Sequence, residues 1–414
     1  MPNLFQHSAA VDFTPTQTAG RSRLNFFRPN MGARYAQNRN FDYGPDLRTN
    51  VSALSPWVRT RTLLEEDLSR AALSRFAYST AEKFHQEICW RTYFKGWLEH
   101  HPGVWSAFLA GRDEAASNSL YDLDLKARLQ TALAGETGID CFDAWVQELV
   151  ATGYLHNHAR MWFASIWVFT LKLPWELGAD FFLQHLLDGD PASNTLSWRW
   201  VAGLHTPGKT YLARRSNIEK FTDGRFSPEN LESEAIPVQG FENPRPISLN
   251  LPDLQVYGDI GILLTEDDLN VETLCLPHVD VKAIAACAFP DDRSPQGCGP
   301  VVRKFLDGAI DDAMRRGVER YKVRARKLSS DGFEADLLVW AQDHNLTTII
   351  AGYPPTGWCR DRLEKARKNL GAAGVALHYL IRPWDRAFWP HANKGFFKLK
   401  KAIPDVYRSL GLPV

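Results

Sequence analysis

The spacing of apolar residues changes once along the 414-residue chain, and this change restricts the fold more than any other feature. Before residue 226, apolar residues recur at three- and four-residue spacing, which is typical of amphipathic helices. After residue 258 they form short runs, as buried parallel strands do. The stretch between is acidic and rich in proline, a composition typical of a linker. We therefore expect a helical domain over 1–225, a linker over 226–258 and an α/β domain over 259–414.

The helical spacing is clearest in five segments, 65–76, 81–100, 123–134, 141–151 and 156–173. Residues 1–60 are rich in Asn, Arg, Pro and Thr and show little periodicity, which predicts an extended arm or irregular loop. We expect no strand before residue 250.

In the last third of the chain, strand-like runs alternate with helical patterns. The runs are 260–265, 283–289, 347–353 and 375–381, and the helical patterns are 301–316, 333–344 and 358–370. This alternation predicts a Rossmann-like open parallel sheet. The segment has neither GxGxxG nor GxxxxGK[ST], so nothing indicates a standard dinucleotide or triphosphate loop.

Composition excludes some classes of function. Lys plus Arg and Asp plus Glu both number 48, so contact with nucleic acid would need a local basic patch. The six cysteines form no CxxC pair, which predicts reduced thiols and no metal site. The N-terminus lacks a basic start followed by an apolar run, and the apolar stretch 161–171 is too short to span a bilayer. We expect a soluble, cytoplasmic protein that makes no membrane contact.

One polar segment has the residue types of a binding site. Asn157, Arg160 and Met161 share one face of a predicted helix, and Asp188 is an available carboxylate partner for Arg160. Asp190, Asn194, Trp198 and Trp200 follow. The alternative interpretation is a helix cap followed by tryptophans of the core.

Several ordered motifs bear on this choice. They are Ser52-Ala-Leu-Ser-Pro56, Glu87-Ile-Cys-Trp-Arg91, the run ATGYLHNHAR at 151–160, the Leu-Pro-Trp step at 173–175, and DGDPASN followed by SWRW over 188–200. Together they resemble the FAD-binding core of the photolyase and cryptochrome flavoprotein family. The resemblance implies an all-helical FAD-binding domain.

In that family an α/β antenna domain precedes the helical domain, whereas here the helical half comes first. The C-terminal half nevertheless resembles the antenna domain in ILLTEDDL at 262–269, the GYP and CRD steps at 352–361, and NKGFFK at 393–398. In the first of these, acids and Thr replace the family's arginines. The resemblance therefore implies a circularly permuted member, which chain connectivity tolerates when the old termini lie close together.

The resemblance implies that FAD is the cofactor and assigns its contacts residue by residue. Asn194 would face flavin N5, the Arg160 and Asp188 pair would lie beside the isoalloxazine, and Asp190 would lie near its carbonyl edge. Val51 stands where the family usually has Thr, which removes one hydroxyl contact. The remaining expected cofactor contacts are Tyr35, Ser52, Leu54, Ser55, Glu87, Arg91 and Asn157.

The resemblance also implies a pocket for a flipped-out pyrimidine dimer and a chain of tryptophans that re-reduces the flavin. The pocket residues would be Glu87, Trp90, Asn157, Met161 and Trp200, with Arg39 at the DNA face. Trp198 and Trp175 match the proximal and middle members of the chain. No distal member is evident; Tyr121 could substitute, although an aromatic that packs between helices is the simpler interpretation. The expected catalytic residues are Glu87, Asn194, Trp198 and Trp175.

The resulting hypothesis is a light-driven DNA repair lyase that acts as a monomer and splits cyclobutane pyrimidine dimers in damaged DNA with reduced FAD. The alternatives are a cryptochrome-like photoreceptor with a signalling partner and a flavoprotein with a dark reaction, since fold does not fix function. A basic run that could contact DNA phosphates comprises Arg199, Lys209, Arg214, Arg215, Lys220 and Arg225. The sequence identifies neither a second chromophore nor the dimer class, because His156 and His158 flank Asn157 without matching the histidines of (6-4) enzymes.

Overall fold

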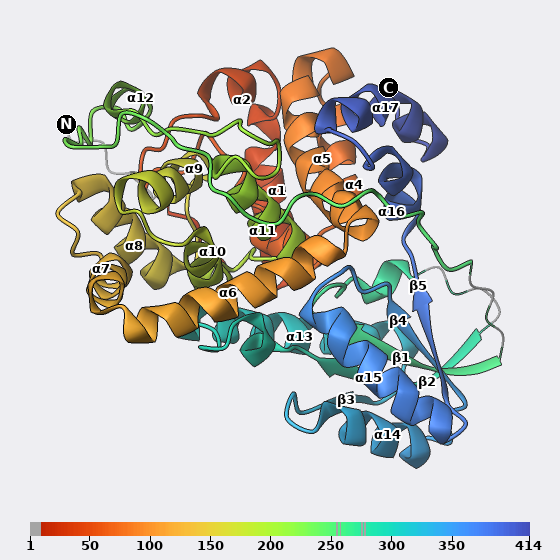
Figure 1. Ribbon diagram of the computed structural model, residues 1–414. Helices are drawn as coiled ribbons and strands as arrows, with labels where there is room; N and C mark the ends of the chain where they lie inside the picture. Colours follow the sequence, from red (N-terminus) through yellow and green to blue (C-terminus); the bar gives the residue numbers. More distant parts are fainter. Residues whose placement is uncertain (1–9, 254–255, 257, 275, 277–278) are drawn as a thin grey trace, which may run out of the picture.

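The computed structural model describes residues 10–253, 256, 258–274, 276 and 279–414, and it shows a helical half followed by a sheet (Figure 1). Within the described residues no strand precedes Gly258. A π-helical turn, Ile166–Thr170, extends α9. The helices of the first half are α1 (Gln17–Phe27), α2 (Ala33–Asn38), α3 (Ser55–Arg59), α4 (Glu65–Leu73), α5 (Tyr78–His100), α6 (Gly103–Tyr121), α7 (Leu123–Ala134), α8 (Asp140–Thr152), α9 (Asn157–Ser165), α10 (Trp175–His185), α11 (Pro191–Val201) and α12 (Arg215–Phe221).

The expectation of an irregular arm over residues 1–60 is wrong, because α1, α2 and α3 lie in it. Thr16 caps α1 by accepting a hydrogen bond from the Ala19 amide at 3.2 Å. The helix then buries only Leu24 and Phe27 among its larger apolar side chains. Two buried apolar positions are too few to produce a helical period in the sequence. Contacts with the rest of the fold therefore determine that this segment is helical.

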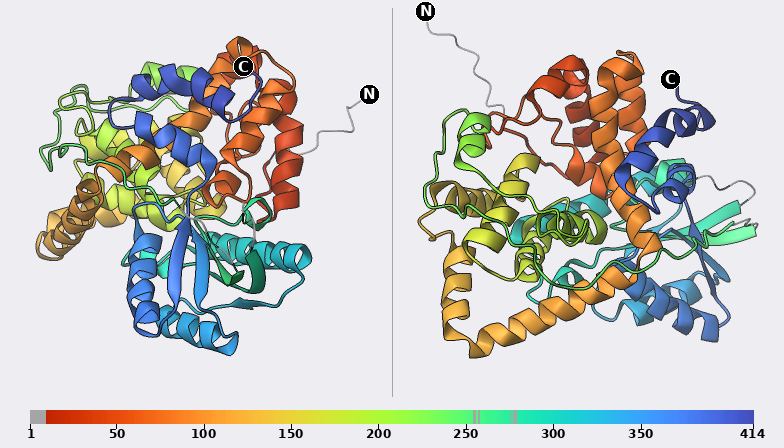
Figure 2. Two further views of the ribbon diagram at one scale, coloured as in Figure 1. Left: turned by 90° about the vertical axis from the view of Figure 1, so that its right-hand side faces the viewer. Right: turned by 45° about the horizontal axis from the view of Figure 1, so that its top comes forward.

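The second half is a five-stranded parallel sheet with the order β3-β2-β1-β4-β5. Helices connect its strands and lie against it (Figure 2). This arrangement confirms the predicted fold class. The elements are β1 (Gly258–Thr265), β2 (Val279–Cys287), α13 (Pro300–Tyr321), β3 (Ala325–Lys327), α14 (Phe333–Asp343), β4 (Thr348–Gly352), α15 (Trp358–Ala372) and β5 (Ala376–Leu380).

The edge strand β3 was not predicted. It has three residues, and two of them, Arg326 and Lys327, are charged and exposed. Such a strand lacks the apolar run from which the other four were predicted, and short charged strands are common at sheet edges.

The stretch between α12 and β1 contains no helix or strand in its described residues. It is nevertheless tied to the helical half. The Val238 amide donates to the Ala202 carbonyl at 3.1 Å, and the Ile247 amide donates to the His100 carbonyl at 2.8 Å. The predicted linker segment therefore runs along the helical half rather than away from it.

After β5 the chain returns to the helical half in α16 (Pro383–Phe388) and α17 (Phe396–Ser409), which lie against α5 (Figure 1). The Tyr407 hydroxyl lies 2.9 Å from Ser69 Oγ and 3.1 Å from His85 Nδ1. Trp384 Nε1 donates to Thr92 Oγ1 at 3.0 Å. The C-terminal helices are thus part of the surface beside α5.

The described cysteines are free thiols, and Cys275 lies outside the described residues. In the part of the chain that the structure describes, no helix combines the length and apolarity needed to span a bilayer.

Candidate functional site

The loop before α3 is fixed by one guanidinium. Arg23 of α1 donates to the carbonyls of Arg48, Val51 and Ser52 at 2.7–2.8 Å. Ala53 adopts a positive φ of 49° and lets the chain turn into α3. Leu54 is buried, whereas Ser52 and Ser55 stay partly exposed, so their hydroxyl groups are the accessible ones. The sequence did not identify Arg23, because its role depends on a contact between separate segments.

The Arg160 and Asp188 pair expected from the sequence is present. Arg160 Nη1 lies 3.0 Å from Asp188 Oδ1, and Arg91 Nη2 lies 3.7 Å from Asp188 Oδ2. Burial raises the pKa of Asp188, but Arg160 and Arg91 outweigh burial and lower it, with the Ser55 hydroxyl contributing. The Asp188 carboxyl is therefore ionised and holds α5, α9 and the loop before α3 together.

Asp190 caps α11. Its Oδ1 accepts hydrogen bonds from the amides of Ala192 at 3.0 Å and Ser193 at 2.8 Å. Its Oδ2 pairs with Arg91. Asn194, one turn later, donates from its side-chain nitrogen to the Ala179 carbonyl at 2.8 Å. Asp190 thus caps the helix and also belongs to the candidate site. The alternative interpretation, a helix cap followed by tryptophans of the core, therefore does not exclude a binding site here.

Glu87 and Arg39 form a partly exposed ion pair near these residues. Arg39 Nε lies 3.4 Å from Glu87 Oε1, and the Glu87 side chain is 34% exposed. Burial raises the pKa of Glu87, and Arg39 only partly opposes this effect. The Glu87 carboxyl therefore reaches solvent although its surroundings partly desolvate it.

Two histidines hold the end of α2 against α9. His156 Nε2 donates to the Arg39 carbonyl at 3.0 Å, and its Nδ1 accepts from the His158 amide at 3.1 Å. His158 Nδ1 lies 3.0 Å from the Asn40 carbonyl. These histidines therefore position Arg39 beside the first turn of α9, which begins at Asn157.

The residues expected at the lesion face are all at least partly exposed. Asn157 and Trp200 are exposed, and Met161 and Trp90 are half-buried. Trp200 stacks on Tyr211, with a centroid distance of 5.5 Å. Trp90 stacks on Phe396 of α17 at 3.7 Å and 11°, a contact that the sequence did not suggest.

The expected electron-transfer tryptophans are buried. Trp198 is 1% exposed and Trp175 is 4% exposed. The indole of Trp198 meets Trp167 edge to face at 6.2 Å, so Trp167 is a further aromatic of this cluster. Tyr121 is 85% exposed at the end of α6, which contradicts the expectation that it packs between helices.

Tyr35 is buried in α2 and contacts Phe27 and Phe84 edge to face. Burial raises its pKa well above the ordinary value for tyrosine.

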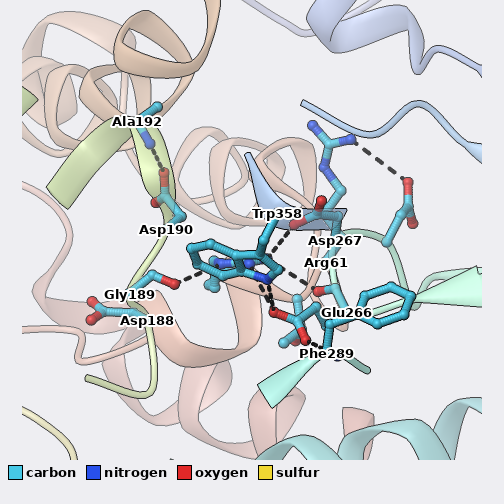
Figure 3. Close-up of polar contacts among 12 residues, drawn as sticks. Arg61, Asp188, Gly189, Asp190, Ala192, Glu266, Asp267, Phe289 and Trp358 are labelled. Atoms are coloured by element: carbon cyan, nitrogen blue, oxygen red, sulfur yellow. Dashed lines mark hydrogen bonds and ion pairs between the residues drawn. The ribbon is translucent and has the colours of Figure 1, made fainter. Parts of the chain in front are cut away.

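Side chains of the α/β half contact the 188–190 loop of the candidate site. Figure 3 shows the Trp358 indole between the 188–190 loop and Glu266, and Trp358 Nε1 donates to Glu266 Oε1 at 3.0 Å. The Gly189 carbonyl accepts from Arg59 Nε at 3.0 Å and from Arg293 Nη2 at 2.7 Å. The loop with the two aspartates is therefore held by side chains from both halves.

The acidic residues after β1 pair with arginines at the end of α3 and just beyond it. Arg59 contacts Glu266 at 3.3 Å and Asp267 at 2.7 Å. Arg61 contacts Asp268 at 3.6 Å. The acidic sequence Thr265-Glu-Asp-Asp268 is thus a junction between the two halves.

The predicted basic run is not a continuous free surface. Arg199 is 2% exposed and donates to the Phe241 carbonyl and to Asn243 Oδ1, so it cannot contact phosphate. Arg225 pairs with Asp42 at 3.1 Å. Lys209, Arg214, Arg215 and Lys220 are exposed.

Comparisons with known proteins agree with the sequence motifs. A family model described as the FAD binding domain of DNA photolyase matches residues 84–226. Over 228 residues the chain is 29% identical to cryptochrome DASH of Idiomarina loihiensis, covering 54% of this chain and 48% of that protein. Over 206 residues it is 31% identical to a deoxyribodipyrimidine photo-lyase of a Synechococcus strain, covering 48% of this chain and 41% of that protein. The chain thus spans less than half the length of each of these relatives.

A crystal structure of a bacterial class III photolyase from Agrobacterium tumefaciens aligns with a TM-score of 0.43 at 27% identity, over 53% of this chain and 46% of that chain. The resemblance to the photolyase and cryptochrome family is confirmed over the helical half, in which residues 84–226 match the family's FAD-binding domain.

Proposed function

We propose that this protein is a light-driven DNA repair flavoenzyme that splits cyclobutane pyrimidine dimers by electron transfer from reduced FAD to a flipped-out lesion. One observation carries the proposal: the residues assigned to the lesion reach the surface, whereas the inner part of the expected flavin site and its electron-transfer tryptophans are buried. The residues assigned to the lesion and DNA are partly exposed or exposed, whereas Asp188, Asp190, Asn194, Trp198 and Trp175 are buried. A substrate must enter from solvent, whereas a flavin and its electron donors work best in a dry interior.

The residues present fit FAD. The Ser193 hydroxyl is buried without a protein partner, one residue before Asn194, so a polar ligand would satisfy it. Arg91 and Arg160 are 13% and 21% exposed, so each still offers donors to a ligand. The residues that would hold the cofactor are Tyr35, Ser52, Leu54, Ser55, Glu87, Arg91, Asn157, Arg160, Asp188, Asp190 and Asn194. When bound and reduced, FAD supplies the electron that starts dimer cleavage.

The protein's own contribution would be to bind the lesion and stabilise the charge on it. The indoles of Trp90 and Trp200 offer stacking faces, and the Asn157 amide can bond to base edges. The raised pKa of Glu87 brings its carboxyl closer to the range in which it can donate a hydrogen bond to a dimer carbonyl. Arg39 pairs with Glu87, and its guanidinium would contact the phosphates of the extruded strand.

The direct test is a repair assay. Purified protein loaded with FAD and photoreduced is given oligonucleotides that contain either a cyclobutane dimer or a (6-4) product, and intact thymines are counted after blue light. We expect repair of the cyclobutane dimer. Full FAD occupancy without repair of this lesion would reject the proposal.

The second candidate is a cryptochrome-like photoreceptor without repair activity. The stack of Phe396 on Trp90 favours it, because one face of this indole is already covered. Light-dependent binding of a protein partner, combined with no preference for lesion DNA, would support this role. Preferential binding of dimer-containing DNA would count against it.

A further inference from the structure

Helix α17 carries an exposed aromatic ring surrounded by lysines. Phe397 is 76% exposed, and Lys394, Lys398 and Lys401 near it are exposed as well. Within α17, Lys401 follows Phe397 by four residues and Lys398 by three, so these three side chains share one side of the helix. Lys394 lies just before the helix, whose N-cap is Gly395. We call Lys394, Phe397, Lys398 and Lys401 the α17 patch.

The α17 patch stands on a firmly packed helix. Phe396, adjacent to Phe397, is buried and stacks on Trp90, a residue assigned to the lesion pocket. Lys400 Nζ lies 3.1 Å from a Glu82 carboxyl oxygen at the start of α5. The Tyr407 hydroxyl anchors the far end of the helix on Ser69. The patch is therefore fixed beside Trp90, which lies three residues after Glu87 on α5.

The lysines of the α17 patch are not neutralised by the acidic residues near them. Lys398 Nζ donates to the neutral Asn393 amide oxygen at 2.8 Å. The nearby acids are engaged elsewhere, since Glu82 pairs with Lys400 and Asp405 pairs with Arg408. Across the whole chain basic and acidic residues balance, so a free basic cluster of this kind is the local patch that a polyanion would need.

We propose that the α17 patch binds the single-stranded part of DNA next to the lesion, with the lysines on phosphates and an unpaired base stacked on Phe397. This inference deepens the proposed function and rests on it for the identity of the partner. An aromatic ring between basic side chains is the arrangement that binds single strands with little sequence preference. Extrusion of the pyrimidine dimer also leaves neighbouring bases unstacked, and an aromatic ring can stack on one of them.

The test measures binding of a fluorescent, lesion-free oligo(dT) in the dark by anisotropy, with an RNA of the same length in parallel. Phe397→Ala should weaken binding about tenfold, the lower end of the loss from removing one base stack, and Phe397→Trp should restore it. The triple change K394E/K398E/K401E should lower the slope of log K against log salt by about 2, since each contact to a single strand contributes about 0.7.

The matched control is K365E/K368E on α15, which reverses two exposed lysines on the α/β half. Circular dichroism and thermal unfolding confirm that each variant is folded. Unchanged DNA binding in folded Phe397→Ala and triple-lysine variants would overturn the inference, as would an equal loss in the control or α17-dependent binding of RNA alone. Because the assay uses neither light nor a lesion, DNA binding through α17 without dimer repair would reject the repair function and leave only the contact between α17 and single-stranded DNA.

Discussion

At the scale of single residues, His156 couples the site to pH. Its Nδ1 is the acceptor that caps α9, so protonation removes the cap, and burial lowers its pKa to about 4. In the unfolded chain the pKa of histidine is about 6.5, so the unfolded state takes up the proton first. The contribution of neutral His156 to the stability of the fold is therefore complete above pH 6.5 and is lost as the pH falls towards 4.

We therefore expect the free energy of unfolding to fall by up to about 3 kcal/mol between pH 6.5 and pH 4 through His156 alone. Urea titrations at several pH values measure this slope. His156→Gln should make this slope shallower but not remove it, because burial also lowers the pKa of His85 and of His205 to about 4. The control is His391→Gln, at a partly exposed position that does not cap a helix with its side chain. A slope that is the same in all three proteins would show that His156 does not titrate in this way.

Glu87 gives the second prediction at this scale. Glu87→Gln should keep the flavin bound and lower the quantum yield of repair about tenfold, because a hydrogen bond to a charged group contributes about 1.5–3 kcal/mol. Flavin absorbance and repair yield are measured on the same sample. Glu114→Gln on α6, which changes an exposed acid, is the control. An unchanged yield with bound flavin would remove Glu87 from the lesion site.

The sequence identified some of these residues and missed others for a physical reason. Arg160 and Asp188 lie in separate motifs; the need of a buried arginine for a carboxylate, together with the family resemblance, predicted their pairing, and the pair is present. Arg23 and Trp358 could not be identified, because each acts on a loop far away in the chain. Their roles follow from tertiary contacts, which one sequence does not contain.

At the scale of elements, α10 and α11 pack closely because Gly178 has no side chain. A Cβ at Gly178 would lie 2.3 Å from the Trp198 ring, so Gly178→Ala must displace this indole. We expect a loss of about 1–3 kcal/mol in unfolding free energy, the usual cost of overpacking a core. Gly371→Ala in α15 is the control, since nothing lies within 4 Å of its Cβ and the helix should gain up to about 1 kcal/mol. Equal stability of the two variants would contradict the close packing of Trp198.

Periodicity predicted elements well only where a continuous apolar face exists. Helix α7 has the predicted bounds, and α8 differs by one residue at each end. Helices α1 and α2 and strand β3 were missed, because they bury few residues of their own and depend on neighbours. Helix α3 buries most of its residues but has only five, which is too short to show a helical period. Helix α17 was also missed, although its apolar residues Phe396, Leu399, Ile403, Val406 and Tyr407 are spaced by three and four.

At the scale of the whole molecule, the helical half precedes the sheet, and the circular permutation that the family resemblance implies stays a prediction. The structure offers a physical reason for the acids after β1. Arg59 at the end of α3 and Arg61 two residues later are buried and need carboxylate partners. Glu266, Asp267 and Asp268 supply them. Arginines at these positions would place like charges together in the interior.

The charged junction between the two halves predicts that they unfold together. Asp268 is buried between Arg61 of the helical half and Arg382, whose Nη2 lies 2.7 Å from Asp268 Oδ1, and these cations lower its pKa against the effect of burial. Asp268→Asn removes the charge that two buried guanidinium groups face, which should cost about 3–5 kcal/mol. Asp280→Asn, which breaks an exposed pair with Lys282, should cost about 0–1 kcal/mol. Because the junction joins both halves, calorimetry should show one transition that moves to lower temperature in Asp268→Asn; a shift no larger than that of Asp280→Asn would mean that other contacts hold the halves together.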